Sequence, residues 1–350
     1  MMNVLGIESS CDETSAAVVR ADGEVLANVV YSQIEVHAPY GGVVPELASR
    51  AHMRAVAPVV REALRALPHG FADIHGIAFT QGPGLIGALL VGVQAAKAIA
   101  YARSLPMVGV DHLLGHLFAI YLHSSGQSWS VPKMPFVALL VSGGHTGLYE
   151  VRDINHVTLL GQTRDDAAGE AYDKVAKMLG LGYPGGPIVD RLAQEGDPLA
   201  VRLPKPMVQS AAIEFSFSGL KTAVAQHLRV NGAPKTDRQL SDLCASFQNA
   251  VVEVLVSKSL AALEQQGVDR LVLTGGVAAN RGLRARAQAA CDSRAAQLYI
   301  PPLHFCTDNA AMIAYAGSQL LARGERAGTD AAAFSRSMLG QVVEEQCKEL

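Results

Sequence analysis

Two stretches of the chain share the same alternation of apolar and polar positions. Residues 4–19 read as an apolar run (VLGI), a polar turn (ESSCDETS) and a second apolar run (AAVV). Residues 136–151 repeat this plan with FVALLV, SGGHTG and LYEV. Apolar runs bounded by small polar residues are typical of strands, and two such runs joined by a short turn predict a β-hairpin. The sequence therefore predicts two hairpins with functional turns.

Helical periodicity follows both predicted hairpins, over residues 45–67, 87–103, 170–179 and 240–265. This order predicts an α/β protein of two lobes, each opened by a hairpin. Ligands of such folds bind between the lobes, where loops from both halves converge. The proline-rich residues 130–135 mark the expected boundary, and residues 322–350 are expected to hold a final short helix and a loose tail.

Composition agrees with this picture and limits the partners. The 350 residues allow one large domain or two of ordinary size. Apolar residues make up 49% and aromatic residues 5% of the chain, which suits a buried, helix-covered sheet rather than an all-β fold. The net charge of −3 lacks the basic excess of proteins that hold nucleic acid alone. Any nucleic-acid contact is therefore expected to be local or shared with a partner.

The cysteines and the apolar segments predict a cytoplasmic protein. The five cysteines are scattered, odd in number and without a C-x-x-C pair: Cys11, Cys244, Cys291, Cys306 and Cys347. This usage predicts free thiols in a reducing compartment. No signal peptide is expected before the first strand. The longest apolar stretch, residues 85–102, is interrupted by Gln94 and Lys97, so we expect a buried helix rather than a membrane span.

His112 and His116 are the most informative candidates for chemistry. Four residues apart on a helix, they fall on one face and can reach one metal ion. A zinc protease of the H-E-x-x-H type carries a glutamate beside the first histidine as general base, and Leu113 occupies that position here. The pair can hold a metal but lacks the base for that hydrolysis. The alternative is two core histidines bonded to backbone.

The turns of the two hairpins carry groups suited to an anionic ligand. The first turn, residues 8–14, holds three carboxylates, three hydroxyls and a thiol, which can bind phosphate, hold a metal or take a proton. In the second turn, residues 142–147, two glycines allow close approach of an anion, and Ser142, His145 and Thr146 add donors. The alternatives are a polar turn that caps itself and a glycine-rich hairpin turn.

Two later segments add candidate groups for a nucleotide. Residues 270–280 predict a buried strand, a Gly-Gly turn and a helix that starts near Asn280, where the asparagine caps the helix or bonds ribose or base. The segment is not G-x-G-x-x-G, which disfavours a Rossmann site. Acidic residues in 165–174 favour a helix dipole, yet Asp173, with Gly186 and Asp190, is also placed to bond sugar hydroxyls.

The chain offers one further metal-ligand candidate and a basic group. Either Thr307 or Asp308 caps a helix near the end, or Asp308 supplies a third ligand beside the two histidines. The basic residues are expected to form a solvated helix face that can also contact an RNA backbone. They are Arg281, Arg284, Arg286 and Arg294.

The motifs, taken in order, resemble one family. They are ESSCDET, HAPYGGVVPELASRAH, TQGPGLIGALLVG, VSGGHT, DAAGEAYDKVAK, YPGGP, FSFSGLKT, TGGVAAN and CTDNAAMIA. From about residue 4 to residue 317 the chain resembles the tRNA adenosine threonylcarbamoyltransferase family, bacterial TsaD type, within the actin/hexokinase/Hsp70-like superfamily. The PYGGVVPELASR form is similar to bacterial and organellar members rather than archaeal ones.

The resemblance implies a fold and a reaction. The fold is α/β, with two actin-like (RNase H-like) lobes, mixed sheets flanked by helices and the ligand in the interlobe cleft. The expected N-terminal lobe spans residues 1–133, completed by a returning helix at about 309–345, and the C-terminal lobe spans 134–308. The implied reaction transfers the threonylcarbamoyl group from threonylcarbamoyl-AMP to N6 of adenosine 37 in tRNAs that read ANN codons, forming t6A.

Motif matching to the family assigns three roles. His112, His116 and Asp308 would hold one Fe²⁺ or Zn²⁺ ion, and Asp12 and Glu13 would lie by the reacting group, where either is a candidate proton acceptor. The residues that would bind the adenylate are Leu140, Val141, Ser142, Gly143, Gly144, Asp173, Gly186, Asp190 and Asn280. Leu113-Leu114 replaces the family's commoner Met-Glu, and Gly147 replaces its usual Gln, but neither change removes a proposed ligand.

The resemblance also implies partners: tRNA through its anticodon loop, a TsaB-like paralogue and a TsaE-like P-loop ATPase, without a membrane.

Three other functions compete with this interpretation. A metalloprotease would need a general base beside the first histidine, and Leu113 occupies that position here. A sugar or acetate kinase would use Mg²⁺ and a base aimed at a hydroxyl, whereas two histidines favour a borderline metal. A non-catalytic scaffold would not need the complete ligand set.

Overall fold

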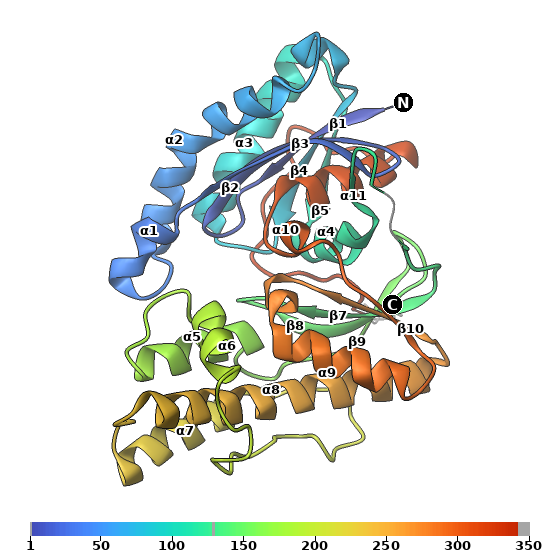
Figure 1. Ribbon diagram of the computed structural model, residues 1–350. Coiled ribbons are helices and arrows are strands. Elements are labelled where there is room, and N and C mark those ends of the chain that lie inside the picture. Colours follow the sequence, from blue (N-terminus) through green and yellow to red (C-terminus); the bar gives the residue numbers. More distant parts are fainter. Residues whose placement is uncertain (1, 128–129, 342–350) are drawn as a thin grey trace, which may run out of the picture.

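Two β-sheets form the framework of the chain (Figure 1). The computed structural model describes residues 2–127 and 130–341. The first sheet has the order β5-β4-β1-β2-β3-β6 and consists of β1 (Asn3–Glu8), β2 (Glu13–Arg20), β3 (Glu24–Ser32), β4 (Gly76–Gly82), β5 (Met107–Asp111) and β6 (His123–Ser124). The second has the order β11-β10-β7-β8-β9 and consists of β7 (Phe136–Val141), β8 (Thr146–Val151), β9 (Val157–Gln162), β10 (Arg270–Thr274) and β11 (Gln297–Tyr299).

Both predicted hairpins are confirmed. β1 pairs antiparallel with β2, and β7 pairs antiparallel with β8. The strands are apolar on both faces because helices cover both sides of each sheet, as in other helix-covered sheets. Each hairpin is extended by parallel neighbours, β4 beside β1 and β10 beside β7. The turns of the two hairpins thus occupy equivalent places in the two sheets.

The helices divide into three layers (Figure 1). α2 (Pro45–Leu64) and α3 (Ile86–Arg103) cover the outer face of the first sheet. α4 (His112–Phe118) and α11 (Ala310–Ala322) lie between the two sheets, in a core that contains residues of both. The second sheet is covered on its other side by α5 (Ala168–Met178), α6 (Gly185–Ala193), α7 (Ser218–Asn231), α8 (Asp237–Gln266) and α9 (Arg281–Asp292). Short helices fill the connections: α1 (Ile34–His37), η1 (Ala38–Tyr40), η2 (Gly70–Asp73), η3 (Ala119–Tyr121), η4 (Gly276–Ala279) and α10 (Leu303–Cys306).

Glycines allow α11 to approach the first sheet closely. A Cβ on Gly6 would lie 2.3 Å from the carbonyl oxygen of Ala310, and one on Gly317 would lie 2.3 Å from the Cβ of Ala78. Neither distance is sterically possible, so a side chain at either position would push the helix away from the sheet. β5 leads into α4, and α10 leads into α11. The ends of β5 and α10 thus lie in one small region between the sheets.

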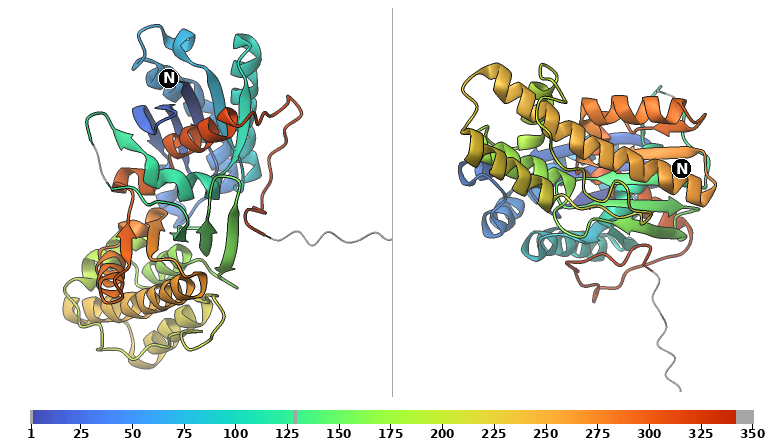
Figure 2. Two further views of the ribbon diagram at one scale, coloured as in Figure 1. Left: turned by 90° about the vertical axis from the view of Figure 1, so that its right-hand side faces the viewer. Right: turned by 90° about the horizontal axis from the view of Figure 1, so that it is seen from below.

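The C-terminal segment differs from the expectation. α11 spans Ala310–Ala322, shorter than the helix expected at about 309–345, and it ends before Gly324, whose φ of +90° is not helical. The chain then runs along one side of the molecule past both sheets (Figure 2). It is held by backbone hydrogen bonds from Ala327 to Met107 and from Leu159 to Gly340. Residues 342–350, with Cys347 and the rest of the expected tail, lie outside the described residues.

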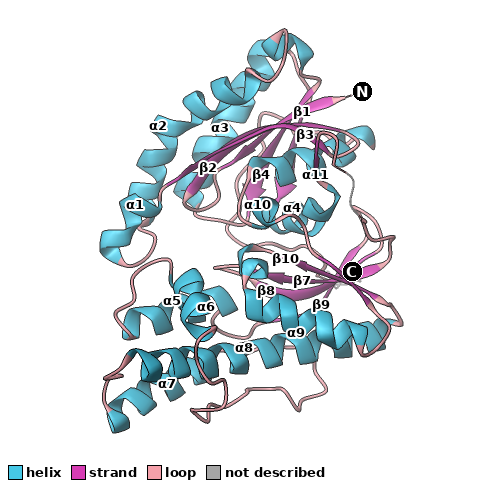
Figure 3. Ribbon diagram, viewed as in Figure 1, coloured by secondary structure: helices cyan, strands magenta, loops and turns pink. Residues whose placement is uncertain are grey.

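The four predicted helices are confirmed, with ends displaced by at most four residues (Figure 3). One of them, α3, is long and apolar enough to cross a membrane by length and composition alone. It contributes Val93, Ala96 and Ala100 to the core beneath the first sheet. Because core helices of globular proteins pass the same test, α3 is weak evidence for a membrane span.

Candidate active site

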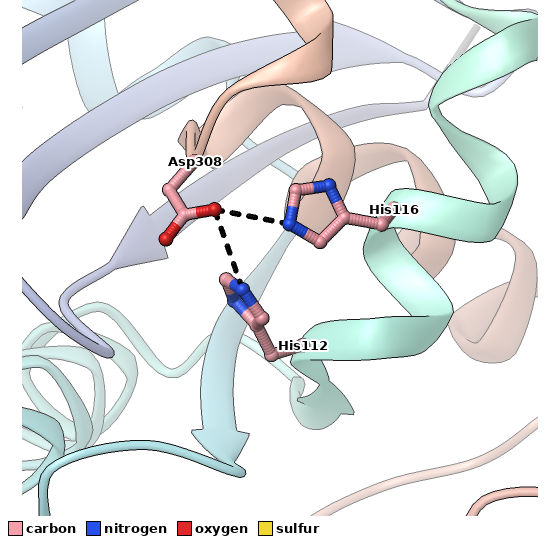
Figure 4. Close-up of side chains that lie close together, drawn as sticks. All are labelled: His112, His116 and Asp308. Atoms are coloured by element: carbon pink, nitrogen blue, oxygen red, sulfur yellow. Dashed lines mark hydrogen bonds and ion pairs between the residues drawn. The ribbon is translucent and has the colours of Figure 1, made fainter. Parts of the chain in front are cut away.

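His112, His116 and Asp308 meet between the two sheets (Figure 4). Nε2 of His116 lies 3.0 Å and Nε2 of His112 lies 3.4 Å from the same oxygen of Asp308. The possible ligand atoms of the three residues all lie within 4.8 Å of one another. Both histidines are buried, His116 completely. We refer to these three residues as the His–His–Asp centre.

Local capping explains how the three side chains come to face one another. The Asp111 carboxylate accepts a hydrogen bond from the N–H of Leu113 at 2.9 Å, so α4 starts at His112 and both histidines share one face. α11 is capped by Asn309, which accepts from the N–H of Met312. The expected cap at Thr307 or Asp308 is therefore wrong. Asp308 precedes the cap, and its carboxylate is directed at the histidines.

Glu8, at the end of β1, supports the centre from behind. Its buried carboxylate lies 3.0 Å from Nδ1 of His112 and accepts a hydrogen bond from the Thr80 hydroxyl at 2.6 Å. A carboxylate accepts, so Nδ1 of His112 carries a proton. In the metal-free protein Nε2 is protonated as well and faces Asp308, whereas with a metal bound Nε2 would present its lone pair to the ion. A carboxylate behind a histidine is a common support of a metal ligand.

Charges within the centre shift the pKa values of its members. Burial would lower the pKa of His112, but the charges of Asp308 and Glu8 raise it well above the ordinary value. Burial would raise the pKa of Asp308, but its contacts with His112 and His116 hold it well below the ordinary range. The carboxylates of Glu8 and Asp308 thus favour a positive charge at the centre, carried by a protonated imidazole or by a bound metal ion. Two imidazole nitrogens and one carboxylate oxygen form a donor set that fits a borderline divalent metal.

The first turn places two carboxyl groups near this centre. Asp12 is buried, and Glu13 begins β2. Burial, followed by the charges of Asp308 and Asp12, raises the pKa of Glu13 to about 10. At neutral pH Glu13 is therefore protonated in the metal-free protein.

The second turn is closed by its own hydrogen bonds. The N–H of Ser142 donates to the carbonyl of His145 at 2.8 Å, and the N–H of His145 donates to the Ser142 hydroxyl at 3.1 Å. The N–H groups of Gly143 and Gly144 make no hydrogen bond to residues that the structure describes, and both residues are exposed. These two donors are free for a ligand. Leu140 differs, because its side chain is fully buried in the core between the sheets.

A pocket of about 330 Å³ lies beside the second turn. Five residues expected to bind the adenylate line it: Gly143, Asp173, Gly186, Asp190 and Asn280. Val141 and Ser142 do not line it, and Val141 is buried in the core under β7. The volume is within the range of small-molecule sites. Residues that were not expected to bind the adenylate complete the wall, among them Gly169, Tyr172, Pro184, Pro187 and Arg281.

Hydrogen bonds within the protein hold two polar residues of the pocket, Asn280 and Asp190, in place. Asn280 accepts from the N–H of Leu283 at 2.8 Å and donates to the amide oxygen of Gln248 at 2.7 Å. Asp190 accepts from Gln248 and from the guanidinium of Arg281. Gln248, on α8, therefore fixes both residues, a role that no local pattern in the sequence indicates.

Asp173 keeps more of its bonding capacity. One of its oxygens accepts from the N–H of Gly185 at 2.7 Å. Burial raises the pKa of Asp173, against these backbone hydrogen bonds at the start of α6. A carboxylate has about four lone-pair sites, so Asp173 can still accept from sugar hydroxyls.

Shifts in two pKa values indicate that the pocket lies near the His–His–Asp centre. His145, in the turn that lines the pocket, has its pKa lowered to about 4 by burial and by the charges of His112 and His116. Tyr183, beside the pocket, has its pKa raised by burial and by the charges of Asp12 and Asp173. The first turn, the second turn and the pocket therefore surround one region where the halves of the chain meet.

Comparisons with known proteins identify the family. The family profile described as "TsaD: tRNA N6-adenosine threonylcarbamoyltransferase" matches residues 24–315. A protein named tRNA N6-adenosine threonylcarbamoyltransferase from Sorangium cellulosum (strain So ce56) is 56% identical over 349 residues, covering 97% of this chain and 98% of its own. Proteins of the same name from Geotalea uraniireducens (strain Rf4) and Anaeromyxobacter dehalogenans (strain 2CP-C) are 54% and 55% identical over 94% of this chain, covering 94% and 97% of their own.

Solved structures support the fold alone. Full-length HypF in its phosphate- and nucleotide-bound form matches with a TM-score of 0.56 at 13% identity, over 95% of this chain and 47% of its own. Component A of (R)-2-hydroxyglutaryl-CoA dehydratase from Acidaminococcus fermentans matches with a TM-score of 0.52 at 16% identity, over 92% and 100%. The expected α/β fold of the actin/hexokinase/Hsp70-like type is confirmed. With the relatives above, these findings show that the chain belongs to the tRNA N6-adenosine threonylcarbamoyltransferase family.

Proposed function

We propose that the chain moves the threonylcarbamoyl group from threonylcarbamoyl-AMP to N6 of adenosine 37 in tRNAs that read ANN codons, with one Fe²⁺ or Zn²⁺ ion bound to the protein. The family makes the chain a transferase of tRNA modification. One observation carries the finer proposal: His112, His116 and Asp308 converge within 4.8 Å, next to a pocket of about 330 Å³. A metal and an adenylate thus have adjacent places.

The pocket suits the adenosine part of the donor. Asp173 would accept hydrogen bonds from the ribose, and Gly186, Asp190 and Asn280 form the surrounding wall. The free N–H groups of Gly143 and Gly144 would donate to the phosphate, because a glycine turn lets the backbone approach an anion. Leu140 and Val141 would act through the backbone of β7, and Ser142 through its closure of the turn.

His112, His116 and Asp308 would hold the metal, with Glu8 fixing the imidazole of His112. A divalent metal bound here supplies Lewis-acid stabilisation of negative charge on phosphate or carbamoyl oxygens. The two histidines are buried and Asp308 is half-buried, so few water molecules compete for these donors. The His–His–Asp set explains the metal dependence that we propose.

The bond changes assign a task to the first turn. The N6 nitrogen of adenosine forms a bond to the carbamoyl carbon, the bond from that carbon to the phosphate oxygen breaks, and AMP leaves. The amine proton would pass to Asp12 or Glu13, and Glu13 can accept it only when ionised, a form that a bound cation would favour. Positioning dominates the rate, because an exocyclic amine is a weak nucleophile. The base must be splayed out of the anticodon loop to reach the site.

We further propose partners and a compartment. The net charge of −3 favours tRNA binding that is shared with a TsaB-like paralogue and a TsaE-like ATPase. The thiols of Cys11, Cys244, Cys291 and Cys306 are free, which favours the cytoplasm. Residues 1–133 and 134–308 are proposed as the two lobes, with α11 completing the first, since it packs on β1, β2 and β4.

The test is transfer from labelled threonylcarbamoyl-AMP to an ANN-decoding tRNA transcript, with the partner proteins present. A matched transcript carrying guanosine at position 37 is the control, because it lacks the N6 amine. We expect label in the first transcript alone. Label in both transcripts, or in neither, would overturn the proposed reaction.

A further inference from the structure

Three consecutive carbonyl groups of the first turn are each held by a different element. The carbonyl of Ser10 accepts from the N–H of Leu85 at 2.8 Å, and that of Asp12 accepts from the N–H of Gln33 at 2.9 Å. Between them, the carbonyl of Cys11 lies 3.0 Å from Nε2 of His52. The first two donors are backbone groups. His52 is the side-chain donor of the three, so it is the anchor that a substitution can remove.

His52 joins the two residues that flank Asp12 and Glu13. A carbonyl only accepts, so Nε2 carries the proton, and Nδ1 of the neutral ring accepts from the Thr14 hydroxyl at 2.7 Å. The ring is completely buried on α2. Burial lowers the pKa of His52 despite its hydrogen bond to Cys11, which agrees with a neutral ring. One rigid side chain thereby bridges Cys11 and Thr14.

The first turn is joined to the His–His–Asp centre at its start. Nδ1 of His112 lies 3.0 Å from the Glu8 carboxylate and 3.2 Å from the Ser10 hydroxyl. Asp12 and Glu13 follow directly, so a shift of this backbone would change where their carboxyl groups lie relative to the centre. The bonds of His52 to Cys11 and Thr14 oppose such a shift.

We propose that His52 is a positioning residue of the transfer reaction, which holds Asp12 and Glu13 toward the His–His–Asp centre through its bonds to Cys11 and Thr14. This inference rests on the role proposed above for the two carboxyl groups. It also gives a function to residues 37–52, the family-like segment that the proposed reaction leaves unused.

A second histidine of that segment reinforces the arrangement. Nε2 of His37 lies 3.2 Å from the side-chain oxygen of Gln33, and its Nδ1 accepts from the N–H of Val44 at 3.3 Å. His37 thus fixes Gln33, whose own N–H holds the carbonyl of Asp12. Both histidines act on the backbone of the first turn, and neither is among the three metal-ligand candidates.

Two substitutions separate the hydrogen bonds of His52. His52→Asn keeps an acceptor near Nδ1 for Thr14 but removes the donor to Cys11, whereas His52→Gln places an amide donor near Nε2. His69→Asn, at an exposed histidine, is the matched control. The readouts are the single-turnover rate at saturating threonylcarbamoyl-AMP and tRNA, the affinity for the donor, the metal content and the thermal unfolding curve.

We expect His52→Asn to slow single turnover about 100-fold, with donor affinity and metal content unchanged. His52→Gln should recover most of this rate, and His69→Asn should match wild type. A normal rate in His52→Asn, or a loss equal to its loss of folded protein, would overturn the inference. If that variant does not fold, Thr14→Val, which removes the other bond at nearly constant shape, must slow turnover by the same small factor as His52→Gln.

Asp12→Asn and Glu13→Gln distinguish failure of the inference from failure of the proposed function. If neither variant slows transfer, the proposed role of the two carboxyl groups is wrong and the inference falls with it. If one of them slows transfer while both His52 variants act normally, only the inference is wrong.

Discussion

Replacing Glu8 by glutamine should weaken metal binding without removing a metal ligand. The Glu8 carboxylate is fully buried, lies 3.0 Å from Nδ1 of His112 and accepts from Thr80 and from the N–H of Ser10. Glutamine keeps the shape but removes the negative charge that holds the His112 proton on Nδ1. The His112 ring then loses the partner that directs Nε2 at the metal position.

The size of the effect follows from this burial. Loss of a carboxylate that supports a metal ligand costs about 10- to 100-fold in metal affinity. The Glu8 carboxylate has 0% exposure, so no water can take its place. We therefore expect the loss of metal affinity in Glu8→Gln to lie at the upper end of this range. We expect about 100-fold weaker binding, which corresponds to about 2.8 kcal/mol.

Chelator competition with Zn²⁺ and with Fe²⁺ under anaerobic conditions measures this affinity. Glu150→Gln is the matched control, because Glu150, on β8, is also buried but pairs with Arg152 at 3.1 Å. It should bind metal like wild type even if its stability changes. If Glu8→Gln also binds metal like wild type while His112→Ala does not, Glu8 does not support the centre and our account of the histidine proton is wrong.

Two further predictions concern stability. Glu13→Gln should stabilise the metal-free protein by up to about 3 kcal/mol at neutral pH. Folding raises the pKa of Glu13 from 4.5 to about 10, so the folded state binds the extra proton and wild-type stability falls as pH rises between these values; urea unfolding across this range should show the slope in wild type and a smaller one in the variant. Gly275→Ala should lower the free energy of unfolding by about 1–3 kcal/mol, because Gly275 has a φ of +89° and an added Cβ would lie 2.4 Å from the carbonyl oxygen of Val141. Gly276→Ala is the control and should unfold like wild type, because a Cβ at that position would meet no atom within 4 Å.

The elements that the sequence predicts best are those set by local pattern. Both hairpins and four helices follow from apolar periodicity, and Asn280 caps α9 as one of its two proposed roles requires. Spacing alone also places His112 and His116 on one face of a short helix. These features depend on residues a few positions apart, so one sequence is enough to find them.

The parts that the sequence could not supply depend on contacts between distant segments. Glu8 reads as one polar residue of a turn, and its role appears only when β1 and α4, 104 positions apart, bring its carboxylate to His112. Gln248 lies inside a long, mostly buried helix, and only the fold sets it beneath Asp190 and Asn280. The cap of α11 is Asn309 rather than Thr307 or Asp308. All three are good cap residues, and the sequence does not show that the Asp308 carboxylate pairs with His116 instead.

The central claim is that the His–His–Asp centre serves threonylcarbamoyl transfer to tRNA. The most direct test is single-turnover transfer from labelled threonylcarbamoyl-AMP to an ANN-decoding tRNA with the partner proteins present. It compares wild type, His112→Ala and the control His227→Ala, at a half-buried histidine on α7. We predict that wild type and His227→Ala label adenosine 37 and that His112→Ala loses both metal and transfer. Normal transfer by a metal-free His112→Ala would contradict the account, because the centre would then be structural.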